Sequence, residues 1–341
     1  MLGKFNIAII GYGYWGPNLV RNFSGLDNCQ VAYVCDQRVE QLALVAKHHP
    51  SIATTSDYQH VLADTSVNAV AIATPVSTHF TLAMQALAAG KHVWIEKPLT
   101  TTSQQASLLI EEAKRRKLIL FVDHTFVYTP AVRRIKQLID LNELGDIYYY
   151  DSTRVNLGLF QSDVSVLWDL AVHDLAIMDY LLGLQPSAVS ATGIAHVPRA
   201  PENMAYLTLF FDRKSPPLIA HVHVNWLSPI KIRRTLIGGS QKMIVYDDLD
   251  ATEKIKLYDK GIMVANDTES QYQRRVGYRT GDMIAPQLLM TEALHVAAAH
   301  FVGCCQTGET PITDGNAGLR VICILEAASE SLSRNGYPIN L

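Results

Sequence analysis

Over the first third of the chain, short apolar runs alternate with segments that have the spacing of helices. Five of these runs are mostly hydrophobic and do not alternate with polar positions, and they lie at residues 7–10, 31–36, 68–73, 92–95 and 119–122. Continuous runs of this kind are typical of strands that are buried on both faces of a parallel sheet. The intervening segments predict helices at 39–47, 57–62, 79–89 and 103–117. The alternation predicts a doubly wound α/β domain with a parallel sheet.

From about residue 145 the pattern changes to closely spaced strands, many of which alternate between apolar and polar positions. The predicted strands lie at 147–156, 189–197, 204–211, 218–226, 232–237 and 242–246. Predicted helices lie at 166–182, 287–305 and 314–333. Alternation indicates an antiparallel sheet with one covered face. We therefore predict a doubly wound domain over residues 1–124 and an α+β domain with an open, mostly antiparallel sheet over residues 125–341.

Composition and charge argue against several classes of protein. Of the 341 residues, 48% are hydrophobic and 18% are charged, and the net charge of −3 predicts no surface for nucleic acid or for an anionic membrane. No apolar run is long enough to span a membrane. The first strand begins by Asn6, which leaves no room for a signal peptide, so we expect a cytoplasmic protein. The five cysteines lack zinc-binding spacing, so we expect reduced thiols and no metal site.

A glycine-rich loop follows the first strand. Gly11, Gly13 and Gly16 form a G-x-G-x-x-G pattern, with Tyr14 and Trp15 between the last two glycines. In a dinucleotide-binding loop, the first glycine permits a tight turn, the second lets the backbone approach the pyrophosphate, and the third lets helix and strand pack closely. The N-terminus of the following helix then offers free N–H groups to the phosphates. A βαβ unit with a glycine turn and no ligand is the alternative.

An acidic residue stands where the second strand is expected to end. Asp36 comes 20 residues after Gly16, close to the spacing of the carboxylate that accepts hydrogen bonds from the ribose hydroxyls of a dinucleotide. This carboxylate would repel a 2′-phosphate, so NAD is predicted rather than NADP. Arg38 lies two residues further on and could offset that charge.

Other polar residues also lie just past strand ends. Thr74 and Pro75 follow the third apolar run, Glu96 and Lys97 follow the fourth, and His124 follows the fifth. Because ligands of doubly wound sheets bind beyond the carboxyl ends of the strands, these residues and the glycine loop are expected to converge on one crevice.

Lys97 is the first candidate for chemistry. A lysine at the end of a buried strand, between Glu96 and Pro98, is poorly placed for solubility alone. Partial burial and the positive charge of a nearby nicotinamide would favour the neutral amine, which can take part in acid–base work. A surface lysine at a strand end is the alternative, and the sequence alone leaves both open.

The second candidate is the segment WDLAVHD at residues 168–174, on a predicted helix. Residues four apart share one helix face, so Asp169 could orient His173 and raise its basicity. A surface pair, or a core histidine with a satisfied hydrogen bond, is the more common meaning of an isolated D-x-x-x-H pattern.

Together, the glycine loop, E-K-P at 96–98 and W-D-x-x-x-H-D at 168–174 resemble the Gfo/Idh/MocA oxidoreductases, over essentially the whole chain. The resemblance implies a Rossmann domain that binds NAD, then a domain whose open sheet commonly mediates oligomers. It implies proton transfer by Lys97 and His173, with Asp169 completing the catalytic set. It also implies a cofactor lining that includes Thr74, Pro75, His79 and Glu96.

Four further segments resemble the branch of this family that acts on nucleotide-linked amino sugars, such as the UDP-N-acetylglucosamine and UDP-N-acetylglucosaminuronate 3-dehydrogenases. They are GYWGPN at 13–18, DHTF at 123–126, RVNLG at 154–158 and VLWDLA at 166–171. Many members of the branch have proline where this chain has Val172. The likeness implies hydride transfer at C3 of a UDP-amino sugar, in amino-sugar or surface-polysaccharide biosynthesis. The predicted substrate contacts are His124, Arg154, Asn156, Trp168 and His173.

Other functions stay open at this point. The chain could be a reductase of dTDP-linked 3-ketosugars or a dehydrogenase of cyclitols or free sugars, and a non-catalytic regulator that binds NAD and a sugar is a different class. The second domain has too few predicted helices to cover both faces of its sheet, and an exposed apolar face is a liability. We therefore expect a homodimer or homotetramer formed through that sheet.

Overall fold

The computed structural model describes residues 4–158, 164–213, 215–264 and 276–341. Contacts divide the chain into two units. The first consists of Met1–Thr129 with Thr291–Cys323, and the second consists of Pro130–Met290 with Ile324–Leu341. A late segment of the chain thus packs with the N-terminal unit. The division into domains after residue 124 stays a prediction.

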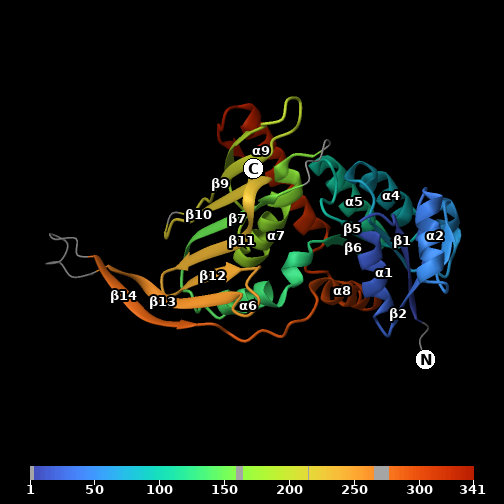
Figure 1. Ribbon diagram of the computed structural model, residues 1–341, viewed down its shortest axis with the longest axis horizontal. Coiled ribbons are helices and arrows are strands. Elements are labelled where there is room, and N and C mark those ends of the chain that lie inside the picture. Colours follow the sequence, from blue (N-terminus) through green and yellow to red (C-terminus); the bar gives the residue numbers. More distant parts are fainter. Residues whose placement is uncertain (1–3, 159–163, 214, 265–275) are drawn as a thin grey trace. The chain divides into compact units, whose positions relative to one another are not determined.

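The first unit contains a six-stranded sheet in the order β3-β2-β1-β4-β5-β6, and all of its pairings are parallel. Figure 1 labels β1, β2, β5 and β6 of this sheet. Its strands are β1 (Phe5–Ile10), β2 (Cys29–Cys35), β3 (Ala53–Thr55), β4 (Ala69–Ile72), β5 (His92–Glu96) and β6 (Leu120–Asp123). The predicted doubly wound sheet is confirmed, and β3 is an additional short strand with no buried residue. The strand order reverses at β1, which is where such sheets bind dinucleotides.

Helices of the first unit connect these strands and complete its core. They are α1 (Gly16–Ser24), α2 (Val39–His48), α3 (Tyr58–Ala63), α4 (Val76–Ala88), α5 (Ser103–Arg116), the 3₁₀ helix η1 (Thr125–Tyr128) and α8 (Ala293–Thr307). Trp94 of β5 stacks on Phe121 of β6 at 4.3 Å between ring centroids, and Phe301 of α8 meets Trp94 edge-on at 5.6 Å. Helix α8 was predicted to begin at residue 287 and begins at Ala293 instead.

The second unit contains a nine-stranded sheet in the order β14-β13-β12-β11-β7-β10-β9-β8-β15. Only the β7–β10 pairing is parallel among the pairings described, which confirms the mostly antiparallel prediction. The strands are β7 (Ile147–Leu157), β8 (Ala188–Ile194), β9 (Met204–Phe210), β10 (Ile219–Asn225), β11 (Leu227–Gly239), β12 (Met243–Asp247), β13 (Ile255–Val264), β14 (Val276–Ile284) and β15 (Ile339–Asn340).

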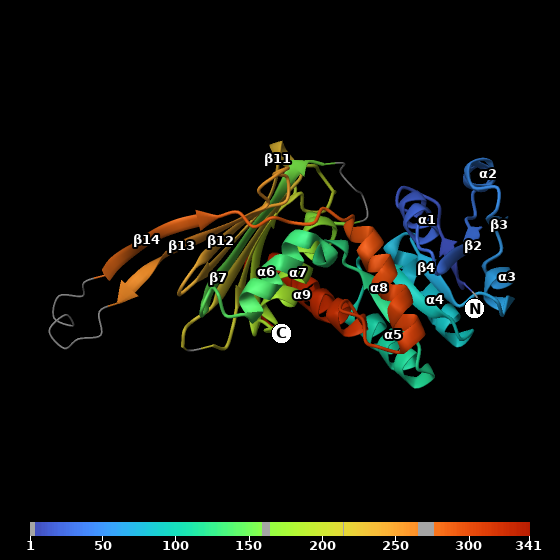
Figure 2. The same ribbon diagram turned by 90° about the horizontal axis from the view of Figure 1, so that it is seen from below.

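Helices α6 (Pro130–Asp140) and α7 (Val172–Leu182), and the part of α9 (Gly315–Ser333) that belongs to the second unit, lie along one face of this sheet (Figure 2). Helix α6 was not predicted, although Val132, Ile135 and Leu138 are buried at helical spacing behind Pro130. The helix predicted over 166–182 is not one regular helix, because a π-helix (Leu167–Ala171) precedes α7. That irregular turn contains Asp169 and adjoins His173.

Candidate active site

The loop after β1 requires glycine at both ends and leaves space in the middle. Gly11 has φ +95°, and a Cβ added there would lie 2.7 Å from the carbonyl oxygen of Ala73. A Cβ on Gly16 would collide with the carbonyl oxygen of Gly11. A Cβ on Gly13 would meet nothing closer than the Arg38 guanidinium at 3.7 Å. The open side of Gly13 fits the close approach of a pyrophosphate to the backbone.

The start of α1 suits an anion. Trp15, at the N-cap, makes no capping side-chain hydrogen bond, Pro17 lies in the first turn, and the first turn contains no acidic residue. The first N–H groups of a helix have no partner within the helix, and the helix dipole favours negative charge at this end. The residues present therefore fit the dinucleotide phosphates that the sequence predicted. Tyr14, predicted beside the cofactor, is 92% exposed.

Asp36 follows β2 and is tied to the glycine loop. Its Oδ2 accepts a hydrogen bond from the Tyr12 backbone N–H at 2.7 Å, and the Arg38 side chain binds both of its oxygens at 2.9–3.0 Å. Burial alone would raise the pKa of Asp36, but the hydrogen bonds from Arg38 and Tyr12 outweigh burial and lower it to about 2. Asp36 is therefore ionised and acts as a hydrogen-bond acceptor beside the loop.

His79 links the loops that follow β4 and β5. Its Nε2 lies 2.9 Å from the carbonyl oxygen of Thr74, and its Nδ1 lies 2.9 Å from that of Pro98. Burial lowers the pKa of His79, although both carbonyls favour a bound proton. Thr74 in turn lies beside Gly11, where its Cγ2 is 2.9 Å from the position of an added Cβ. The predicted cofactor-lining residues Thr74 and His79 are thus brought to the glycine loop.

Lys97 follows β5 and is partly exposed. Its positive charge acts on the ionisable side chains of Glu96, Asp123 and His124, so the ends of β5 and β6 form one cluster. Asp123 also accepts a hydrogen bond from the indole of Trp15 at 3.5 Å, which connects this cluster to the glycine loop. The expected convergence of strand ends is therefore present within the first unit. Asp123 was not predicted, although it ends the strand next to Glu96.

His124 is buried, with 2% of its surface exposed. Burial, with smaller contributions from the positive charges of Lys97 and Arg320, lowers the pKa of His124 to about 3. Neither ring nitrogen has a hydrogen-bond partner among the described residues. The ring is therefore neutral near pH 7, and its predicted contact with substrate stays a prediction.

In the second unit, Asp169 and His173 lie on either side of the junction between the π-helix and α7. The indole Nε1 of Trp226 donates to Oδ2 of Asp169 at 3.3 Å, and that of Trp168 donates to Ser329 at 3.1 Å. Single π-helical turns are frequent at functional sites. No sequence pattern pointed to Trp226 as a partner of Asp169, because the two are far apart along the chain.

Arg154 of β7 is directed towards α7. Its Nε lies 2.6 Å from Oδ2 of Asp174, and both side chains are 4% exposed. Asn156 is half-buried near the end of the same strand. The roles of Arg154 and Asn156 as substrate contacts stay predictions, and the structure adds an ion pair that the sequence did not indicate.

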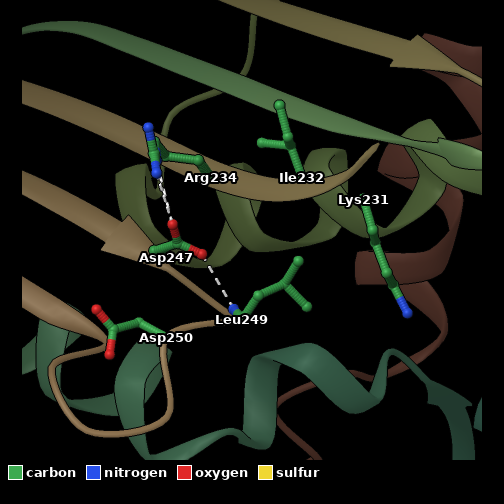
Figure 3. Close-up of a pocket in the computed structure, with 6 residues that line it drawn as sticks. All are labelled: Lys231, Ile232, Arg234, Asp247, Leu249 and Asp250. Atoms are coloured by element: carbon green, nitrogen blue, oxygen red, sulfur yellow. Dashed lines mark hydrogen bonds and ion pairs between the residues drawn. The ribbon is translucent and has the colours of Figure 1, made fainter. Parts of the chain in front are cut away.

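A separate pocket of about 280 Å³ lies in the second unit (Figure 3). None of the predicted site residues lines it. Arg234 pairs with Asp247 at 2.8 Å, and the Lys231 side chain points away from that pair. The lining residues are Lys231, Ile232, Arg234, Asp247, Leu249 and Asp250.

The described residues contain no group of three or more histidine, cysteine, aspartate or glutamate side chains that could hold a metal ion. No helix in that part of the chain is long and apolar enough to cross a membrane.

Comparison with known proteins agrees with this geometry. Residues 5–124 match the oxidoreductase family profile described as an NAD-binding Rossmann fold, and residues 136–341 match the C-terminal alpha/beta domain of the same family. The chain belongs to the Gfo/Idh/MocA oxidoreductase family. The family resemblance noted in the sequence is thereby confirmed. Its first domain is an NAD-binding Rossmann domain.

Two characterised relatives match most of the chain. UDP-N-acetylglucosamine 3-dehydrogenase of Acidithiobacillus ferrooxidans is 29% identical over 317 residues, covering 92% of this chain and 93% of the relative. The NAD(+)-dependent scyllo-inositol 2-dehydrogenase of Bacillus subtilis is 28% identical, covering 98% and 95%. A solved structure of the Acidithiobacillus enzyme has a TM-score of 0.80 at 26% identity, covering 97% of this chain and 99% of that one.

Proposed function

We propose that this oxidoreductase moves a hydride between C3 of a UDP-linked amino sugar and the nicotinamide of NAD. The observation that carries the proposal is the similarity to a UDP-N-acetylglucosamine 3-dehydrogenase, which covers 92% of this chain. Four segments support it, because in them the sequence resembles enzymes of nucleotide-linked amino sugars: residues 13–18, 123–126, 154–158 and 166–171.

The glycine loop and the start of α1 would hold the pyrophosphate of NAD, and Asp36 would accept hydrogen bonds from the adenosine ribose. Thr74, Pro75, His79 and Glu96 would line the remaining part of the cofactor. When bound, NAD supplies the hydride acceptor, and the protein contributes orientation and proton handling.

Oxidation of a secondary alcohol also releases a proton, which the protein must accept. We assign this step to Lys97 and His173, one of which takes the proton of the 3-hydroxyl group. Asp169 orients His173 in this proposal, and Trp226 would hold Asp169 through its hydrogen bond of 3.3 Å. His124, Arg154, Asn156 and Trp168 are the proposed substrate contacts.

A panel of UDP- and dTDP-linked sugars tests the substrate, with NADH absorbance and product mass followed for the wild type, Lys97→Met and His173→Ala. We expect turnover of a UDP-amino sugar and a 3-keto product. Loss of a positioned acid–base group should reduce the rate about 10²–10⁴-fold. NAD binding by both folded variants should persist, because it depends on the glycine loop and Asp36. Near-full turnover by Lys97→Met would refute this active site, and an inert wild type would favour a regulator that only binds.

A cyclitol dehydrogenase is the second candidate. A specific observation favours it, since the scyllo-inositol 2-dehydrogenase is 28% identical over 98% of this chain. The same assay with scyllo-inositol and myo-inositol distinguishes the two candidates. Oxidation of a free cyclitol in preference to every sugar nucleotide would replace the first proposal with the second.

A further inference from the structure

Two carboxyl groups meet at the ends of β5 and β6. Glu96 and Asp123 are in register across these parallel strands, which places their side chains on the same face and close enough for a hydrogen bond between the two carboxyl groups. Asp123 is 1% exposed, and Oε1 of Glu96 is buried without a hydrogen-bond partner among the described residues. Trp94 and Phe121, two residues earlier on the same strands, are stacked at 4.3 Å. The two acids therefore lie next to this aromatic pair on the same face of the two strands.

A hydrogen bond between two carboxyl groups requires a proton, because an ionised carboxylate can only accept. Asp123 already accepts from the hydroxyl of Thr125 at 2.7 Å and from the indole of Trp15 at 3.5 Å. These donors favour an ionised Asp123, which leaves Glu96 as the carboxylic acid that donates. Burial, reinforced by the charge of Asp123, raises the pKa of Glu96 well above its usual range, in agreement with this assignment.

We propose that Glu96 and Asp123 hold one proton between them near neutral pH, and that the pair thereby presents a single negative charge to Lys97. Two ionised carboxylates would place two negative charges beside Lys97, whereas a neutral pair would place none there. One shared proton gives an intermediate field, which suits a group that must both take and return a proton. The pair is thus a positioning and charge-setting element, and its benefit to Lys97 rests on the proposed function.

The other ionisable groups near the pair follow the ends of β5 and β6 or lie on η1 and α9. His124 follows Asp123 and is neutral near pH 7, because burial lowers its pKa to about 3. Tyr128 of η1 is affected by the charge of Asp123, but burial is the main reason that its pKa is raised. The charge of Arg320, on α9, acts on His124. Lys97 is the cation whose charge acts on both Glu96 and Asp123.

Infrared difference spectroscopy of the purified protein tests the shared proton directly. We expect the carbonyl-stretch band of a protonated carboxylic acid at neutral pH, and we expect Glu96→Gln to lack that band. Glu111→Gln is the matched control, since it removes an exposed acid of α5 and should leave the band unchanged. Absence of the band from the wild type, or its persistence in Glu96→Gln, overturns the proposal.

The charge on the pair is tested by the pH dependence of Lys97 labelling with an amine-selective reagent, followed on the Lys97 peptide by mass spectrometry. Glu96→Gln keeps the negative charge on Asp123, so the midpoint of labelling should not move. The double variant Glu96→Gln/Asp123→Asn should lower the midpoint by roughly one pH unit or more, because it removes a unit charge a few ångströms away in a medium of effective dielectric constant ~20. Equal shifts in the single and double variants overturn the proposal.

Neither measurement depends on turnover. If the double variant does not fold, the infrared band and the midpoint of Glu96→Gln still decide the matter. A wild type without turnover would refute the proposed function but would not change the infrared band or the labelling midpoint. Failure of the proposed function can therefore be told apart from failure of the shared-proton proposal.

Discussion

Arg38 occupies both carboxylate oxygens of Asp36, at 3.0 Å through Nε and at 2.9 Å through its terminal nitrogen. The Asp36 side chain is 6% exposed, whereas that of Arg38 is 50% exposed. The carboxylate is thus fixed beside the glycine loop, while the guanidinium extends into solvent. This arrangement bears directly on which dinucleotide is bound, because one residue repels a 2′-phosphate and the other attracts it.

We predict that NAD(H) binds more tightly than NADP(H), and that Asp36→Ala reduces this preference. The variant removes the repulsion of a 2′-phosphate and also frees Arg38 to bind one. Calorimetric titration of both cofactors measures the ratio of dissociation constants. Glu111→Ala, which removes an exposed acid of α5, is the control and should keep the ratio. Equal or tighter NADP(H) binding by the wild type would contradict the prediction.

Two glycines of the loop should respond differently to alanine. Gly13→Ala should fold normally, since its Cβ meets nothing within 3.7 Å, yet it should weaken NAD binding by filling the space of the pyrophosphate. Gly16→Ala should lower the melting temperature, because its Cβ collides with the carbonyl oxygen of Gly11. Thermal unfolding without cofactor and titration with NAD separate the two effects. Unchanged NAD affinity in Gly13→Ala would show that the pyrophosphate does not lie there.

Much of the first unit was predictable because each strand carries its own signal. The five apolar runs form strands whose apolar residues are mostly buried, and the residues that follow them meet at one edge of the sheet. The positions of Gly11, Asp36 and Lys97 follow from this periodicity alone. The proton that we propose Glu96 and Asp123 share could not be predicted from this periodicity, because it depends on which strands are neighbours and on their register.

The second unit was less predictable at its edges and at Asp169. Strands β13 and β14 were not predicted, and β11 is longer than its predicted range because it continues through an irregular pairing with β7. A helix was rightly expected around His173, but the π-helical turn that carries Asp169 depends on tertiary packing. The Trp226 hydrogen bond to Asp169 is likewise a long-range contact that no local pattern specifies.

The sheet of the second unit should form an interface between copies of the chain. Its uncovered face carries Tyr206 and Phe210, which are 50% and 38% exposed, while Leu207 between them is buried. Light scattering at micromolar concentration should therefore give a dimer or tetramer mass, and Tyr206→Lys/Phe210→Asp should lower it. Leu141→Lys, at an apolar residue that is 69% exposed outside the sheet, is the control. A monomer mass for the wild type would refute this.

His124 should make the protein less stable as the pH falls. The unfolded histidine takes up a proton below about pH 6.5, whereas the folded one resists protonation until its pKa of about 3, so the free energy of unfolding decreases across this window. His124→Phe removes that penalty. Between about pH 7 and pH 4.5, the free energy of unfolding of His124→Phe, measured with urea, should fall by about 2 kcal/mol less than that of the wild type. His48→Phe, at an exposed histidine, is the control and should lose as much stability as the wild type over this pH range. If His124→Phe also loses as much as the wild type, burial of a neutral His124 does not cause the pH dependence.

The ion pair of Arg154 and Asp174 should matter more to stability when one partner is removed than when both are replaced. Each side chain is 4% exposed, so Arg154→Met leaves a buried carboxylate without its cation, which should cost about 3–5 kcal/mol in urea unfolding. Arg154→Met/Asp174→Leu should recover most of this loss, because no buried charge remains. Lys136→Met, which breaks the exposed pair with Asp140, should cost less than about 1 kcal/mol.

The same variants separate a structural role of Arg154 from the predicted contact with substrate. Asp174 adjoins His173 on α7, so the ion pair fixes the helix that carries the proposed proton-transfer group. If Arg154 acts only through Asp174, the stable double variant should regain turnover with an unchanged KM for the sugar nucleotide. If Arg154 binds the substrate, the double variant should be stable and have a raised KM. A double variant no more stable than Arg154→Met would refute the argument from buried charge.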